Sequence, residues 1–111
     1  MQKLARHFPL MSARSAPLTP NDISSLLLAN GSMTLEFYAP RGLDSQTPHT
    51  KDEIYIITNG QGWFRSGSDR FAVKHGDALF VPAGVEHRFE DFSDEFDTWV
   101  IFYGPEGGEK P

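Results

Sequence analysis

From residue 33 onward, apolar and polar positions alternate in short runs separated by turn residues. The run 53–58 is rich in β-branched and aromatic residues and stops at Asn59-Gly60. Such runs, bounded by Gly, Pro, Asn or Asp, are typical of β-strands. The predicted strands are 33–39, 53–58, 62–65, 70–74, 78–81, 86–90 and 97–103. Many short strands at this spacing predict an all-β fold, an antiparallel sandwich or barrel.

Residues 23–29 allow two interpretations. Thr19 before Pro20 resembles a helix start, with Thr19 as N-cap and Pro20 at the first helical position. The pair Asn30-Gly31 would then close the helix. The same pair lies between two apolar runs, which is the strongest short signal for a β-hairpin. We favour the hairpin.

The length of 111 residues suits one domain that spans residues 1–111 and is too small for two. Residues 1–22 form a basic lead-in segment, which we expect to be a strand. Residues 104–111 are rich in Gly and Pro, so we expect a mobile tail.

The formal net charge of −5 argues against nucleic acid as a partner, because nucleic-acid binding needs a basic surface. No apolar run approaches the length of a membrane span, so we expect no membrane partner. The chain has no Cys, which excludes thiolate chemistry and fits a cytoplasmic location. Acids gather within 86–97, either as a solvated loop or as an acidic rim of a cavity.

Of the four histidines, His7 and His75 have the context of surface residues. His49 and Glu53 differ, because they precede an apolar run at a spacing of four. On a straight strand they would lie ~13 Å apart, too far to share an ion. The polar stretch 50–52 suits a bend that lets them converge. A helical pair is the competing geometry, which the β-branched run after Glu53 makes less attractive.

The chain also resembles the cupin family. The first cupin motif is G-x5-H-x-H-x3-E-x6-G, in which His49 matches the second His, Glu53 the Glu and Gly60 the last Gly. Thr47 stands where the first metal-binding His belongs. The resemblance covers residues 33–103 and implies a cupin-type antiparallel barrel, the double-stranded β-helix or jelly roll.

The second cupin motif, G-x5-P-x-G-x2-H-x3-N, is matched more fully. Gly76, Pro82, Gly84 and His87 fall at its positions, and Asp91 stands in place of the Asn. These glycines and the proline accept turn dihedrals, and so they return the chain towards the first motif.

The resemblance implies that His49, Glu53 and His87 hold one divalent transition metal. Two His and one carboxylate leave open positions and suit Fe, Mn, Ni, Co or Zn. Water, Thr47 or Gln46 would fill an open position, and Thr47 suits a hydrogen bond to bound water better than direct ligation. The alternative is a metal-free cavity with the three side chains hydrogen-bonded to one another.

Two aromatic residues are candidates to support this site. Tyr55 and Phe89 each lie two residues beyond a motif residue, so they share its face of the strand.

The expected function is a metal-dependent enzyme acting on a small oxygen-rich molecule, as a dioxygenase, isomerase or lyase. The alternative is a non-catalytic module that binds or senses a small molecule, because a fold alone does not decide function. The resemblance and the small core also lead us to expect a homodimer.

Overall fold

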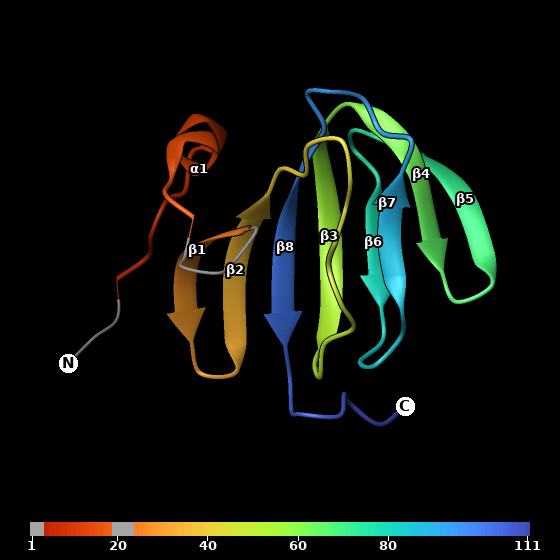
Figure 1. Ribbon diagram of the computed structural model, residues 1–111. Helices are drawn as coiled ribbons and strands as arrows, with labels where there is room; N and C mark the ends of the chain where they lie inside the picture. Colours follow the sequence, from red (N-terminus) through yellow and green to blue (C-terminus); the bar gives the residue numbers. More distant parts are fainter. Residues whose placement is uncertain (1–3, 19–23) are drawn as a thin grey trace.

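The computed structural model describes residues 4–18 and 24–111, and it places their strands in two antiparallel sheets (Figure 1). One sheet has the order β1-β2-β8-β3-β6 and the other the order β5-β4-β7. The elements are α1 (Leu10–Ser15), β1 (Ser24–Asn30), β2 (Met33–Tyr38), β3 (Asp52–Asn59), β4 (Gln61–Ser66), β5 (Asp69–Lys74), β6 (Ala78–Val81), β7 (His87–Glu90) and β8 (Asp97–Tyr103). The prediction of an all-β antiparallel fold is confirmed.

The hairpin at Asn30-Gly31 is also confirmed. Strand β1 pairs antiparallel with β2, and the register closes on Asn30 opposite Met33. Gly31 has φ +61°, a conformation that glycine adopts without steric cost. The residues that resemble a helix start, 19–22, lie outside the described part of the chain.

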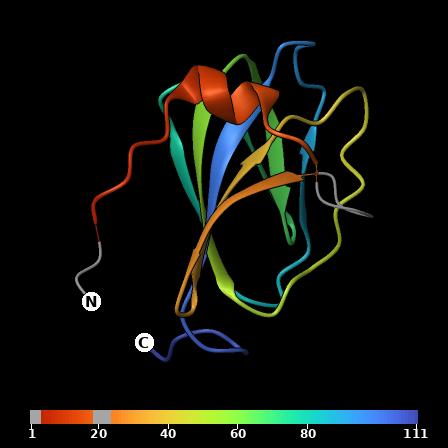
Figure 2. The ribbon, with the colours of Figure 1, turned by 90° about the vertical axis from the view of Figure 1, so that its left-hand side faces the viewer.

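The expected lead-in strand is wrong for residues 10–15, which form the short helix α1 (Figure 2). Its sequence contains Leu, Met, Ala and Arg, which all favour helix, and no run of alternating residues. Ala13 is buried. The Arg14 Nε donates to Asp97 Oδ2 at 2.7 Å, which ties the helix to the start of β8.

The hydrophobic core lies between the two sheets and is largely aromatic. Tyr55, Phe64 and Phe89 are each at most 1% exposed, and their rings contact one another at centroid distances of 5.0 to 5.9 Å. Among the described residues, hydrogen bonds between strands do not join the two sheets into a closed cylinder. The architecture is therefore a jelly roll of two facing sheets.

The C-terminal tail returns to the loop before β3. The Gly107 amide donates to the Thr50 carbonyl at 2.6 Å, and the Glu109 amide donates to Asp52 Oδ2 at 2.9 Å. These contacts place the tail beside the residues that precede the first motif's Glu53. In the described ranges, no helix has the length and apolar character needed to cross a membrane.

Candidate metal centre

Three separate segments position the two histidines and the carboxylate. Glu53 is the second residue of β3 and lies between Val81 of β6 and Phe102 of β8. It faces inward and is 1% exposed, and His87, at the start of β7, is similarly buried at 2% exposed. His49 approaches from the loop before β3. The site therefore lies between the sheets, where the polar groups must satisfy one another.

The chain bends at residues 50–51, between His49 and Glu53, and so the two side chains converge. The His49 carbonyl accepts a hydrogen bond from the Gly84 amide at 2.7 Å. Gly84 belongs to the turn before β7, two residues after Pro82. This contact joins the loop that carries His49 to the turn that delivers His87.

The potential ligand atoms of His49, Glu53 and His87 all lie within 4.8 Å of one another. His49 Nε2 is 2.6 Å from Glu53 Oε1, and His87 Nε2 is 3.2 Å from the same oxygen. Atoms bound to one metal at about 2.0–2.2 Å are spaced on the order of 3 Å apart. The two distances from Glu53 Oε1 to the imidazole nitrogens are close to that value, which fits three side chains that share a single ion.

The far nitrogen of each imidazole is held by a backbone carbonyl. His49 Nδ1 lies 2.8 Å from the Lys51 carbonyl oxygen, and His87 Nδ1 lies 2.8 Å from the Val85 carbonyl oxygen. A carbonyl oxygen only accepts, so each Nδ1 carries the proton. In the neutral ring the Nε2 lone pair then faces Glu53. Metal-ligating histidines are oriented in this way by an outer hydrogen bond.

The electrostatics favour an ionised carboxylate at Glu53. Burial raises its pKa, but the hydrogen bonds from His49 and His87 outweigh burial and hold the pKa below its usual range. Burial lowers the pKa of His87, whereas the bonds to Glu53 and to the Val85 carbonyl raise it, with a net rise. A divalent ion would displace the proton that His87 binds below its raised pKa.

A hydrogen-bonded chain extends from the candidate metal centre through Tyr55 and Gln46, two residues predicted from the sequence to surround it. Tyr55 Oη lies 3.1 Å from His87 Nε2 and donates to Gln46 Oε1 at 2.8 Å. The Gln46 Nε2 donates to Asp44 Oδ2 at 2.7 Å. Both ends of the Gln46 amide are thus engaged, which disfavours Gln46 as a metal ligand. Burial raises the pKa of Tyr55 well above its usual value, so Tyr55 keeps its proton.

Asp44 is a residue beside the site that the sequence does not predict. It is 4% exposed, and its carboxylate accepts from Tyr38 Oη, from the Gln46 amide and side chain, and from the Phe89 amide at 2.8 Å. Burial and the bond to Asp44 raise the pKa of Tyr38. The only signal in the sequence is an acid after the Arg41-Gly42 turn, which is typical of loops and does not single Asp44 out.

Aromatic rings form the wall of the site. Phe89 is 1% exposed and packs edge-to-face on Tyr55, with ring centroids 5.0 Å apart. Phe102 packs edge-to-face on His49 at 4.6 Å. Edge-to-face packing suits the quadrupole of aromatic rings, so these contacts restrict how His49 and Tyr55 turn.

A cavity of about 480 Å³ opens beside the metal centre. Thr47 is exposed and lies in its wall together with Gln46. The lining residues are Ser24, Glu36, Tyr38, Ser45, Gln46, Thr47, His49, Glu53, Tyr55, Val100 and Phe102. The volume is in the range of small-molecule sites.

The acidic stretch 86–97 contributes none of these lining residues. Within that stretch, Glu90 accepts from Arg65, Arg70 and Arg88, and these bonds lower the pKa of Glu90 to about 2. In the described chain, the acids of this stretch are therefore partly paired with arginines rather than arranged around the cavity.

At position 60, the last glycine of the first motif, glycine is required for steric reasons. It has φ +83°, and a Cβ there would lie 2.9 Å from Phe96 Cα. Both the dihedral and the close approach of the backbone require glycine. Gly60 thereby lets the end of β3 pass against the segment that leads into β8.

Comparisons with known proteins agree with this architecture. A crystal structure of a cupin 2 conserved barrel domain protein from Salinispora arenicola superposes with a TM-score of 0.69 over 91% of each chain, at 20% identity. A 63-residue match at 38% identity links the chain to an uncharacterised protein of Streptomyces coelicolor. A 79-residue match at 40% identity links it to an acireductone dioxygenase of Leishmania infantum.

Each of the two sequence matches involves 57% of this chain, and they span 60% and 23% of the two relatives' own lengths. The model of one family, described as the cupin domain, matches residues 34–102. That match covers both motifs and the strands that carry the candidate metal centre, and it includes more than half of the chain. The protein belongs to the cupin family.

Proposed function

We propose that this cupin is a metal-dependent enzyme acting on a small oxygen-rich molecule, with one divalent transition metal held by His49, Glu53 and His87. One observation carries the proposal. The Nε2 atoms of both histidines converge on Glu53 Oε1 while backbone carbonyls fix both Nδ1 atoms. Metal-ligating histidines almost always donate their other ring N–H to an outer partner of this kind.

Two histidines and one carboxylate leave coordination positions open. When bound, an ion such as Fe, Mn, Ni, Co or Zn supplies a Lewis acid that polarises a substrate oxygen or activates water or O2. The cavity wall on the side of Thr47 and Gln46 would receive the substrate. A hydroxyl or carbonyl oxygen is the group that such an ion binds, which is why we expect an oxygen-rich substrate.

Tyr55 would act as an orienting group in this cavity. Its raised pKa keeps Oη protonated near neutral pH, so it donates rather than serves as a base. The chain through Gln46 to Asp44 fixes the direction of the Oη–H bond. Phe89, packed on the ring, holds Tyr55 in place.

The reaction type is a dioxygenation, an isomerisation or a lyase reaction. The similarity to a dioxygenase of Leishmania infantum supports the first, within the matched segment. A non-catalytic binding module has the same site and differs only in turnover. A homodimer and a cytoplasmic location remain predictions.

The proposal is tested by reconstitution. Protein stripped with a chelator is loaded separately with Fe(II), Mn(II), Co(II), Ni(II) and Zn(II), and assayed against a panel of small hydroxy acids, diols and enediols for O2 uptake and product formation. We expect turnover with at least one ion and a loss of turnover, with metal content retained, in Tyr55→Phe. Tight metal binding without turnover of any compound would favour the binding module.

A further inference from the structure

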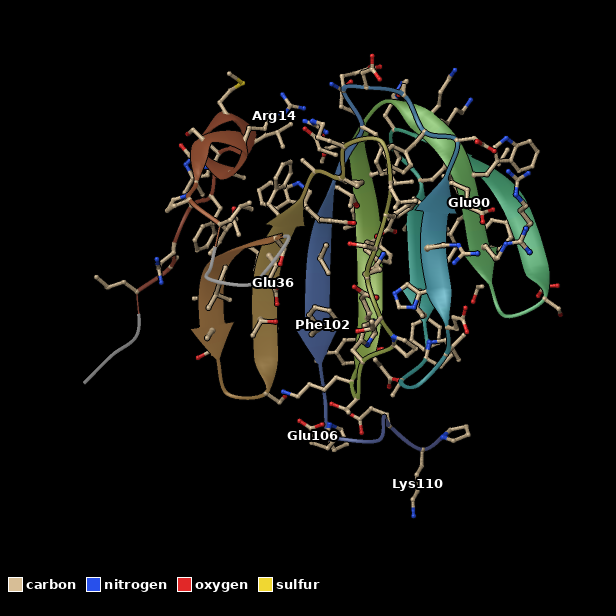
Figure 3. The ribbon with its side chains drawn as sticks, viewed as in Figure 1. Arg14, Glu36, Glu90, Phe102, Glu106 and Lys110 are labelled. Carbon is tan, nitrogen blue, oxygen red and sulfur yellow. The ribbon has the colours of Figure 1, made fainter. Side chains whose placement is uncertain are left out.

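A carboxylate that belongs to neither motif points into the cavity. Glu36 lies on β2, between Leu26 of β1 and Val100 of β8 in the sheet register (Figure 3). Val100 lines the cavity as well, so both side chains face the space between the sheets. An acid at an inward position of a sheet is unusual unless it has a partner, because charged groups are rarely placed facing a core.

Glu36 is held by hydroxyl groups rather than by a cation. The Ser24 hydroxyl donates to Oε1 at 2.7 Å, and the Thr34 hydroxyl donates to Oε2 at 3.1 Å. Each carboxylate oxygen has about two acceptor positions, so both retain capacity for a further donor. Within residues 4–18 and 24–111, no Lys or Arg forms an ion pair with Glu36. Its negative charge is therefore left for a ligand.

The cavity as a whole is formally negative. Its described lining residues include Glu36 and Glu53 but neither Lys nor Arg, and Asp44 lies directly behind Gln46. Even with a divalent ion on the site, these three carboxylates outweigh the ion by one unit of charge. A phosphate or a second carboxylate on the substrate would meet no cation here, whereas a cationic group would meet Glu36.

The strand register sets the distance between Glu36, at one end of the cavity, and Glu53, at the other. Glu36 is opposite Val100, and Val100 is opposite Tyr55, which places Glu36 about 10 Å from Tyr55 between Cα positions, two strand spacings away. Glu53 lies two residues before Tyr55 on β3. A small molecule that binds the ion with oxygen atoms at one end can therefore reach Glu36 with the other.

We infer that Glu36 is a specificity-determining residue that binds a protonated amine of the ligand, whose other end carries the oxygen atoms that bind the metal. This inference rests on the proposed function for the metal-binding end of the ligand. It narrows the substrate class to small amino-bearing hydroxy or carbonyl compounds and disfavours phosphorylated ones.

A matched series of chelating probes tests it. Four alkyl hydroxamates share a chain of about four methylene groups, a length chosen to fit between the two ends of the cavity, and end in methyl, hydroxyl, ammonium or carboxylate. Their affinities for the metal-loaded protein are measured by calorimetry, with metal content checked afterwards. We expect the ammonium probe to bind roughly tenfold more tightly than the methyl and hydroxyl probes, and the carboxylate probe to bind most weakly.

In Glu36→Gln the affinity of the ammonium probe should fall to within about twofold of the affinity of the methyl probe. The affinity of the methyl probe should be unchanged, because the amide keeps the shape of the carboxylate but not its charge. Glu95→Gln, which alters an exposed acid outside the cavity lining, should keep the full preference. Equal binding of the methyl and ammonium probes to the original protein, or of the hydroxyl and ammonium probes, would overturn the inference. An unchanged preference in Glu36→Gln would overturn it too.

A second measurement separates this inference from the metal proposal. Butylammonium and butanol are titrated into metal-free protein, and backbone amide resonances are followed by NMR. We expect butylammonium, but not butanol, to shift the amides of Ser24 and Glu36, and Glu36→Gln to abolish the shift. If the protein holds no metal and this result is still obtained, the proposed function fails while the amine site stands. If metal binds and butylammonium shifts neither amide, the amine site fails alone.

Discussion

The carbonyl oxygen of His49 accepts a hydrogen bond from the amide of Gly84 at 2.7 Å, and this is one of the contacts that join the two cupin motifs in space. One partner is itself a motif histidine, and the other is a motif glycine three residues before His87. Gly84 has φ +79°, which aims its amide at His49. The turn therefore supports the candidate metal centre as well as connecting two strands.

Replacing Gly84 with Ala should weaken both the fold and the metal site. A Cβ at Gly84 has no atom within 4 Å, so the cost is the strained dihedral alone, about 1–2 kcal/mol of unfolding free energy. Gly31→Ala is the matched control, because Gly31 also has positive φ and open space but lies in the β1–β2 turn. Urea denaturation should show similar losses in both variants, while only Gly84→Ala lowers metal affinity. Equal metal affinities would contradict this role of the turn.

Asp44→Asn should destabilise the protein more than Tyr38→Phe does. The substitution puts an amide donor where the carboxylate accepts four hydrogen bonds, one of them from the Phe89 amide on β7. We expect a loss of about 2 kcal/mol for Asp44→Asn, against about 1 kcal/mol for Tyr38→Phe, which removes one donor. Chemical denaturation measures both losses. A smaller loss of unfolding free energy in Asp44→Asn than in Tyr38→Phe would contradict this role of Asp44.

Metal affinity should fall as the pH is lowered. The pKa of His87 is raised in the metal-free protein, so its proton is bound below that raised value and must leave before metal binds. The pKa of Glu53 is lowered, so Glu53 stays ionised through the same range and adds no proton to the exchange. The apparent affinity should drop by about tenfold per pH unit below the His87 pKa and level off above it. A flat profile from pH 5 to 8 would contradict the assignment of His87 as a ligand.

The expected homodimer would use the outer face of the larger sheet. Phe80 of β6 is 57% exposed, and it lies opposite Ile54 on β3, where Ile56 is 39% exposed. Phe80→Glu should shift the protein from dimer to monomer in sedimentation at micromolar concentration, because a charge would be buried in an apolar contact. Lys74→Glu, an exposed change on β5, is the control. A strict monomer before any substitution would contradict the dimer.

The sequence predicts most of the fold because turn residues interrupt the strands so regularly. Asn30-Gly31 and Asn59-Gly60 each end a strand where the structure ends it. The helix α1 is missed because its six residues are too few to establish a period and carry no capping side chain. A stretch this short takes its conformation from tertiary contacts such as that of Arg14 with Asp97.

The convergence of His49 with Glu53 is predictable for a different reason. On a straight strand His49 and Glu53 would lie too far apart for both to bind one ion, so the chain must bend between them. The polar residues between them allow that bend. Asp44 and Glu36 are not predictable in this way. Asp44 gains its role from the Phe89 amide, 45 residues further along the chain, and Glu36 gains its role from the pairing of β2 with β8. Neither relationship leaves a local pattern in the sequence.

Elemental analysis of purified protein tests the three-ligand metal centre most directly. The protein is expressed in medium supplemented with transition metals, desalted, and compared with His49→Ala, His87→Ala and the control His75→Ala, in which an exposed histidine is replaced. The account predicts about one transition-metal ion per chain in the original protein and in His75→Ala, and a small fraction of that in the other two variants. Metal content that is unchanged in His49→Ala and His87→Ala, with all four proteins folded by circular dichroism, would contradict it.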